Sequence, residues 1–124
     1  MNATDSDQPR WNKGHLFAAL DTYQSWLPTR GLTVTSVESE WRYAERFVRW
    51  LYAEYASRGC QPRGDPVPAT RCLTITDLYR VLDGYRAYLH SCGLSPGGIP
   101  TYVIQAGLFV KWLPSSKVRG CSGA

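Results

Sequence analysis

Cysteine and histidine are the residues of this chain with the widest chemical range, and the sequence holds four of the first and two of the second. Thiolates and imidazoles bind zinc when they recur at short, regular spacings. The cysteines stand at positions 60, 72, 92 and 121 without a CxxC pair, and neither His15 nor His90 lies at ligand spacing from them. We expect no metal site, and we place both histidines near helix ends on the surface.

The patterns typical of enzymes are also missing. The sequence contains no P-loop, no dinucleotide-binding glycine pattern and no serine-nucleophile motif. Glu38 and Glu40 are the nearest approach to a carboxylate pair, but residues two apart on a helix point in different directions. The sequence therefore predicts a protein without catalytic residues or cofactors of its own.

The distribution of charged residues is the remaining feature of the sequence that bears on binding. The formal net charge is +4 and the pI is near 9.0. Acidic and basic residues balance as far as Asp83, whereas no acidic residue follows it and four basic residues do: Arg86, Lys111, Lys117 and Arg119. This surplus favours an anionic partner such as nucleic acid. A modest basic excess is equally common in proteins that bind no nucleic acid.

An internal repeat organises the chain. Residues 20–51 align without a gap with residues 82–113, and eleven of the 32 positions are identical. The identical pairs are Leu20/Leu82, Asp21/Asp83, Tyr23/Tyr85, Leu27/Leu89, Gly31/Gly93, Leu32/Leu94, Ala44/Ala106, Phe47/Phe109, Val48/Val110, Trp50/Trp112 and Leu51/Leu113. Each copy is long enough for one supersecondary unit.

Each copy reads as helix, tight turn, helix. The apolar face of the first helix holds Leu16, Leu20, Tyr23 and Leu27, and that of the third holds Leu78, Leu82, Tyr85 and Leu89. The long second helix has an apolar stripe at Val37, Trp41, Ala44, Val48, Leu51 and Tyr55, and the fourth has one at Ile99, Val103, Ala106, Val110 and Leu113. The fourth helix is apolar almost all round, so we expect it in the middle of the bundle or covered by a partner.

Capping residues and glycines suggest where the helices begin and end. Thr33, Thr76 and Ser95 are the expected N-caps of the second, third and fourth helices, with Pro96 at the first helical position of the fourth. Gly31 suits the turn after the first helix, and Gly59 is the expected end of the second.

The chain is long enough for one domain with a single core. We expect a flexible segment over residues 1–12, a helical domain over 13–113 and a flexible tail over 114–124. Helix pairs 13–57 and 76–113 are joined by a loop at 58–75, rich in proline, glycine and arginine. The arginines of this loop either touch phosphates or belong to a solvated linker.

The N-terminus is polar and acidic and lacks the apolar core of a secretory signal, and no apolar run reaches the ~20 residues of a membrane span. We therefore expect a cytoplasmic protein with no membrane partner. Cysteines stay reduced in that compartment. A Cys60–Cys72 disulfide across the loop is conceivable in geometry, but the expected compartment argues against it.

Several motifs together resemble a known family. They are RGLTVT at residues 30–35, CGLSPGG at 92–98, FVRWL at 47–51, FVKWL at 109–113, and LTITDLYRVLDGYRAYL at 73–89. Their order resembles the core-binding domain of tyrosine recombinases and phage integrases over about residues 15–113. The resemblance implies an all-α, SAM-like bundle of four helices, here made of two repeated helix-turn-helix pairs.

In that family the domain clamps double-stranded DNA during recombination and integration, and its second and fourth helices approach the major groove. Carried over to this chain, the resemblance implies contacts from Thr35, Ser36, Ser39, Arg42 and Arg46 on one helix and from Gly98, Thr101, Gln105 and Lys111 on the other. Arginine and glutamine read base edges, and a helix N-terminus suits phosphate. The alternative for the arginines is ion pairing within the helix: Arg42 with Glu38 or Glu45, and Arg49 with Glu45.

The family's chemistry belongs to a C-terminal catalytic domain with no counterpart here, so no residue inherits a catalytic role. The first hypothesis is a DNA-binding module without catalysis of its own, with a recombinase catalytic subunit or a second copy as further partners. The second is a helical protein-interaction or dimerisation module, suggested by the apolar fourth helix. A large exposed apolar patch on that helix would favour the second hypothesis.

Overall fold

The computed structural model describes residues 9–116, 118, 120 and 121. In this part of the chain the elements are, in order, β1 (Arg10–Trp11), α2 (Lys13–Trp26), η1 (Leu27–Arg30), α3 (Val34–Leu51), β2 (Leu73–Thr74), α4 (Ile75–Ser91), α5 (Ile99–Trp112) and η2 (Leu113–Ser115). The prediction of an all-α fold with four helices in two pairs is confirmed. The most apolar helix, α5, has 14 residues, and no helix in the described part is both long and apolar enough to cross a membrane.

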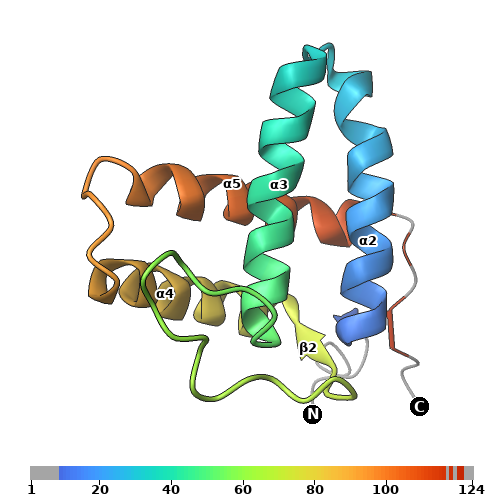
Figure 1. Cartoon of the computed structure of the whole chain (residues 1–124). Helices are drawn as coiled ribbons and strands as arrows, with labels where there is room; N and C mark the ends of the chain where they lie inside the picture. The colour runs from blue at the N-terminus through green and yellow to red at the C-terminus, as the bar shows by residue number, and fades with distance from the viewer. Residues whose placement is uncertain (1–8, 117, 119, 122–124) are drawn as a thin grey trace.

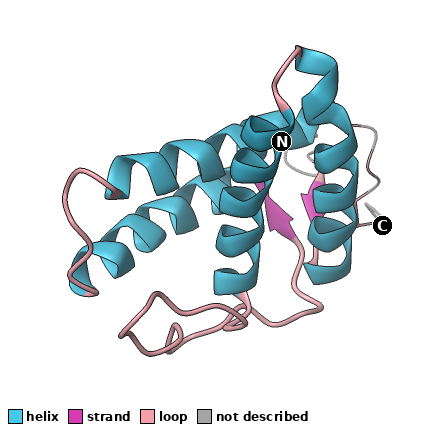
Figure 2. Cartoon of the chain, turned by 45° about the horizontal axis from the view of Figure 1, so that its top comes forward, coloured by secondary structure: helices cyan, strands magenta, loops and turns pink. Residues whose placement is uncertain are grey.

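The two pairs of helices lie across each other. Figure 1 shows α2 and α3 side by side, joined at one end by η1, while α5 runs across them and α4 extends to one side from the lower end of α3. The connector between the pairs, residues 52–72, leaves the lower end of α3 and crosses in front of α4 in that view. The strands form one small antiparallel sheet near the ends of the described chain (Figure 2).

The internal repeat is visible in the structure as a near-twofold relation. Trp11 and Leu73, which are 62 residues apart and therefore equivalent, face each other in the antiparallel register of β1 and β2. Asn12 and Thr74, also equivalent, each cap the following helix in a capping box. Equivalent residues that pair with each other are the mark of a twofold arrangement. The repeat therefore begins at β1, before the first residue of the sequence alignment.

The turns inside the two units are equivalent as well. Gly31 and Gly93 have φ values of 79° and 77°, and their N–H groups donate to Pro28 and His90 at 3.1 Å each. A side chain at this φ is strained, so the two identical glycines are explained by backbone geometry.

The predicted apolar faces of α2 and α4 are buried at every position named from the sequence. The stripe of α5 is buried too, together with Phe109 and Trp112. On α3, Trp41 is only partly buried and donates its indole N–H to the Leu20 carbonyl at 2.9 Å, while Tyr55 lies beyond the helix. Periodicity thus identified most of one continuous core.

Aromatic rings join the two units crosswise. Tyr23 of α2 packs on Trp112 of α5 with ring centroids 4.9 Å apart, and the equivalent Tyr85 of α4 packs on Trp50 of α3 at the same distance. Phe109 and Phe47 complete the two clusters, at 5.1 Å from Tyr23 and 5.4 Å from Tyr85 respectively. Burial raises the pKa of Tyr23 to about 12 and also raises that of Tyr85, so both rings stay neutral in the core. Each unit therefore completes the aromatic core of the other.

The expected end of the second helix is wrong by several residues, since α3 ends at Leu51 and not near Gly59. Tyr52 follows, Ala53 has φ 58°, and the Ala53 and Glu54 N–H groups donate to the carbonyls of Trp50 and Arg49 at 3.1 and 2.8 Å. This is a Schellman ending with alanine where glycine is usual. Nothing in the local sequence signals it, because alanine is a good helix former.

We expect Ala53→Gly to stabilise the protein by about 0.5–1 kcal/mol, because the left-handed conformation is costly for alanine and free for glycine. Urea unfolding followed by circular dichroism measures the change. Ala56→Gly is the matched control, since Ala56 has no positive φ, and it should destabilise slightly. Equal effects at both positions would contradict the assignment.

Two other helix starts differ from expectation. The N-cap of α4 is Thr74, not Thr76, and Asp77 completes its capping box. The predicted Ser95 cap with Pro96 at the first helical position is also wrong: α5 begins at Ile99 and its N-cap Gly98 has no side-chain cap. Gly97 and Gly98 lose more backbone entropy in a helix than other residues, which explains why the helix begins after them.

The prediction that all four cysteines are reduced is wrong, and the conceivable Cys60–Cys72 pair is also not formed. Cys60 bonds to Cys92 and Cys72 bonds to Cys121. The first disulfide ties the connector to the end of α4, and the second ties the C-terminal segment to the residue before β2. The sequence left several pairings open, because spacing alone does not determine connectivity.

The segments expected to be loose at both ends take part in the fold where they are described. Trp11 is buried, and Cys121 donates its N–H to the Arg10 carbonyl at 2.6 Å. Ser115 and Ser116 close η2 with hydrogen bonds back to Trp112 and Leu113. The expectation of flexibility at residues 1–8, 117, 119 and 122–124 lies outside the described residues.

Candidate nucleic-acid interface

The five predicted contact residues of α3 share one side of that helix. They line two adjacent cavities of about 260 and 370 Å3, which have Thr35, Ser39 and Tyr43 in common. Arg42 and Arg46 lie on the first cavity, and Ser36 lies on the second. We call this surface the α3 face: Thr35, Ser36, Ser39, Arg42, Tyr43, Arg46 and Gln105. The helical period alone brings the α3 residues together, since they recur at steps of three and four.

The face begins at the capped N-terminus of α3. Thr33 accepts the N–H of Ser36 at 3.1 Å and donates its hydroxyl to the Ser36 hydroxyl at 3.0 Å, so the predicted Thr33 cap is confirmed. Thr35 and Ser39 are exposed one turn apart. A helix N-terminus carries about half a positive charge, so hydroxyls placed there suit an anion.

The two arginines differ in their surroundings. Arg42 is exposed and forms no ion pair with any residue in the described part of the chain, so its alternative pairing with Glu38 or Glu45 is not made. The ion pair within the helix is formed for Arg49, whose Nε donates to Glu45 at 3.3 Å. Arg46 is half-buried: Nη1 donates to the Tyr102 hydroxyl at 3.5 Å, and its guanidinium lies 5.8 Å from the ring centroids of Tyr43 and Tyr102. These contacts hold Arg46 in place while Arg42 can reorient.

The face is not purely basic. Glu38 lines the first cavity and Glu40 lines the second, so two carboxylates stand beside two arginines. Oε2 of Glu40 and Oε1 of Gln105 are both buried without a hydrogen-bond partner among the described residues. Buried acceptors without a donor are costly, and because both atoms are shielded from solvent they are not open to a docked partner. The face thus combines two cationic donors with two neighbouring carboxylates.

Only one of the predicted α5 residues reaches this surface. Gln105 lines the second cavity beside Thr35 and Ser36. Thr101 is exposed and Gly98 is half-buried, but neither lines the two cavities of the α3 face. Lys111 lies six residues beyond Gln105, roughly 9 Å along the helix axis, and lines a different cavity with Trp26 and Arg30. The nine predicted residues therefore divide between the α3 face and positions outside it.

Sequence reasoning missed the two tyrosines that shape the face. Tyr43 lines both cavities, and its ring meets the Tyr102 ring edge-on at 5.1 Å. A signal for Tyr43 was present, because it follows Ser39 by four residues and so falls on the same side of α3. Tyr102 carried no such signal, since its role depends on how α5 packs against α3.

No group of three or more histidine, cysteine or acidic side chains lies together within the described ranges in a way that could hold a metal ion. Comparison with models of protein families, with curated proteins and with solved structures finds no match for this chain. The resemblance to integrase core-binding domains therefore stays a prediction, and any function rests on the geometry of the chain itself.

Proposed function

We propose that this chain is a DNA-binding module that acts in site-specific recombination or integration without catalysis of its own. The observation that carries the proposal is the α3 face, where hydroxyls at a helix N-terminus, two arginines and one glutamine from α5 lie together. The motifs that resemble the core-binding domain of tyrosine recombinases support the same function. The partner is double-stranded DNA, and a separate catalytic subunit supplies the chemistry.

The residues have different roles on a duplex. Thr35, Ser39 and the α3 N-terminus suit phosphate oxygens, which position a protein without reading sequence. Arg42 reaches out to phosphate or to a base edge, whereas Arg46 is held by two tyrosines and suits one fixed contact. Gln105 is the residue type suited to adenine, and it lines the second cavity of the face. Glu38 and Glu40 limit the strength of purely electrostatic binding, so the module fits a protein that binds DNA together with other domains.

The test is the affinity for a mixed duplex measured at several salt concentrations, starting near 50 mM. Replacing both Arg42 and Arg46 with glutamine should make the slope of log affinity against log salt shallower by roughly 1.8, because each lost phosphate contact contributes about 0.9. Arg58→Gln with Arg86→Gln is the matched control, since both residues are exposed and neither lines the α3 face.

The proposal predicts that the control variant keeps the slope of the wild type. Absence of binding by the wild type near 50 mM salt, or an equal change of slope in both variants, would contradict it. A loss of affinity without a change of slope would mean that the two arginines act on the fold and not on phosphate.

A second candidate, a protein-interaction module, is favoured by two observations. Ile104 of α5 is 58% exposed, and a separate cavity with aromatic walls opens near the C-terminal end of the same helix. That cavity is independent of the α3 face, so both functions are compatible with one chain.

A further inference from the structure

The two aromatic clusters of the repeat differ in what covers them. The cluster of Trp50, Tyr85 and Tyr88 lies under the connector. The Ser57 N–H donates to the Tyr88 hydroxyl at 3.0 Å, and that hydroxyl donates to the Gln61 carbonyl at 2.8 Å. The chain thus binds a segment of itself over this cluster, and both of these hydrogen bonds use the main chain of that segment.

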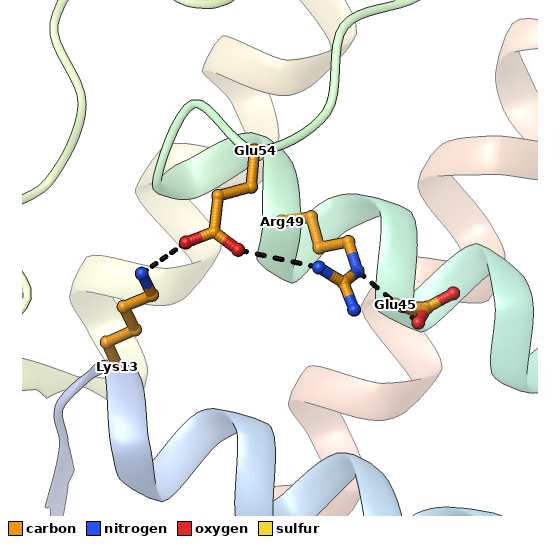
Figure 3. Close-up of polar contacts among 4 residues, drawn as sticks. All are labelled: Lys13, Glu45, Arg49 and Glu54. Carbon is orange, nitrogen blue, oxygen red and sulfur yellow. Dashed lines mark hydrogen bonds and ion pairs between the residues drawn. The ribbon is translucent and has the colours of Figure 1, made fainter.

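Side chains also hold the connector there, at Arg63, Cys60 and Glu54. The guanidinium of Arg63 lies 4.6 Å from the Trp50 ring centroid. Cys60 is bonded to Cys92 at the end of α4. Glu54, at the start of the connector, accepts from Arg49 at 3.4 Å, and Arg49 also donates to Glu45 (Figure 3).

The equivalent cluster has no such cover among the described residues. Tyr23, Trp26 and Trp112 line a cavity of about 320 Å3, which we call the open aromatic site, together with Arg30, Leu108, Lys111 and Ser115. The segment that follows α5 is the equivalent of the connector, but it takes another path. Cys121 bonds to Cys72 and donates its N–H to Arg10, so the described part of this segment leads to β1.

The polar residues of the open aromatic site show what kind of segment would fit. Lys111 stands where Arg49 stands in the first unit, but Gly107 and Ser116 replace the two carboxylates that Arg49 contacts. Arg30 is the equivalent of Cys92, which holds the connector by a disulfide in the other unit. The guanidinium of Arg30 lies 5.4 Å from the Trp26 ring centroid. Neither cation has a carboxylate within ion-pair distance in the described part of the chain. A segment lying here in the manner of the connector must bring its own acidic groups.

We propose that the open aromatic site binds an extended acidic peptide segment of a partner protein, in the conformation that the connector adopts on the equivalent cluster. One carboxylate of the segment pairs with Arg30, in the position that corresponds to the Cys60–Cys92 disulfide. A second carboxylate pairs with Lys111, in the position that corresponds to the Glu54–Arg49 ion pair. The apolar parts of the segment pack against the aromatic rings of the site. This inference does not depend on DNA binding, because the α3 face contributes no residue to the site.

The connector itself supplies the probe. A synthetic peptide with the sequence of residues 54–63 and the change Cys60→Asp places carboxylates opposite both cations. The same peptide with Cys60→Asn is the matched control, because it differs only by the charge. Calorimetric titration of the full, oxidised chain with each peptide should give roughly threefold tighter binding for the aspartate peptide, the size expected for an ion pair with an exposed arginine.

The Arg30→Gln variant should bind both peptides alike, because the residue that separates them is gone. Arg30 is exposed, so we expect the variant to keep its fold, which circular dichroism checks. Fluorescence of Trp26 and Trp112 should respond to the peptide in the wild type. Equal affinities of the two peptides for the wild type, or no binding at all, would overturn the proposal. Single-stranded oligothymidylate provides a further test. If it displaced the peptide from the wild type but not from Arg30→Gln, the result would overturn the proposal and assign the site to nucleic acid.

Discussion

Replacing Cys72 and Cys121 with serine is expected to destabilise the chain by about 4 kcal/mol, and replacing Cys60 and Cys92 by slightly less. The two disulfides span 49 and 32 residues, and closing a longer loop removes more entropy from the unfolded chain. A loss of this size is a large share of the 5–15 kcal/mol that holds a typical domain together. Urea unfolding of the oxidised proteins measures both losses, and titration of free thiols in the denatured wild type should detect none.

The two variants should also differ in where the change appears. Loss of Cys60–Cys92 frees the connector from the end of α4, so Trp50 becomes exposed and its fluorescence shifts to the red. Loss of Cys72–Cys121 frees the segment after η2 and leaves Trp50 covered. Four reactive thiols in the denatured wild type, or a stability that reductant does not change, would contradict both disulfides.

Much of the architecture could be predicted from the sequence because the same physical pattern occurs twice. The period of apolar residues identified the core faces of α2 and α4, and the repeated glycines at positions 31 and 93 marked the turns. Thr33 was identified as a cap because its hydroxyl precedes a periodic run. These features depend on a few neighbouring residues, so they can be found without knowledge of the fold.

What the sequence did not reveal depends on contacts between distant segments. Periodicity shows which face of a helix is buried but not which helix covers it, so the crosswise packing of Tyr23 on Trp112 could not be foreseen. Strands of two residues are too short for an alternating pattern, and β1 was therefore expected to be loose. The pairing of the four cysteines follows from the path of the connector and the C-terminal segment, which no local rule determines.

The candidate site could be predicted only in part, because some of its residues share one helix and others depend on how two helices pack. All five residues predicted on α3 line the α3 face, because a single helix arranges them. Of the four predicted from α5, only Gln105 joins them. The others lie elsewhere because α5 begins after Gly98 and turns its two ends toward different parts of the molecule.

Removing either core tryptophan is expected to be the most damaging single substitution. Trp50→Ala and Trp112→Ala should each cost about 3–5 kcal/mol, the range for truncating a large buried aromatic side chain. The two residues occupy equivalent places, with 3% and 7% of their surfaces exposed. Trp50 also lies under the connector and Arg63, whereas Trp112 borders the open aromatic site. We therefore expect Trp50→Ala to cost more than Trp112→Ala, by about 1 kcal/mol for the lost cation–π contact.

The tyrosines at the centres of the two clusters provide the control. The hydroxyls of Tyr23 and Tyr85 are buried without a hydrogen-bond partner among the described residues, so Tyr23→Phe and Tyr85→Phe remove an unpaired polar group and keep the ring. Each should leave stability unchanged or raise it by about 1 kcal/mol. Chemical unfolding of the four single variants separates ring packing from hydroxyl chemistry. Equal losses for the two tryptophans would mean that the connector does not stabilise the cluster that it covers, and a large loss from either phenylalanine variant would reveal a partner for the hydroxyl.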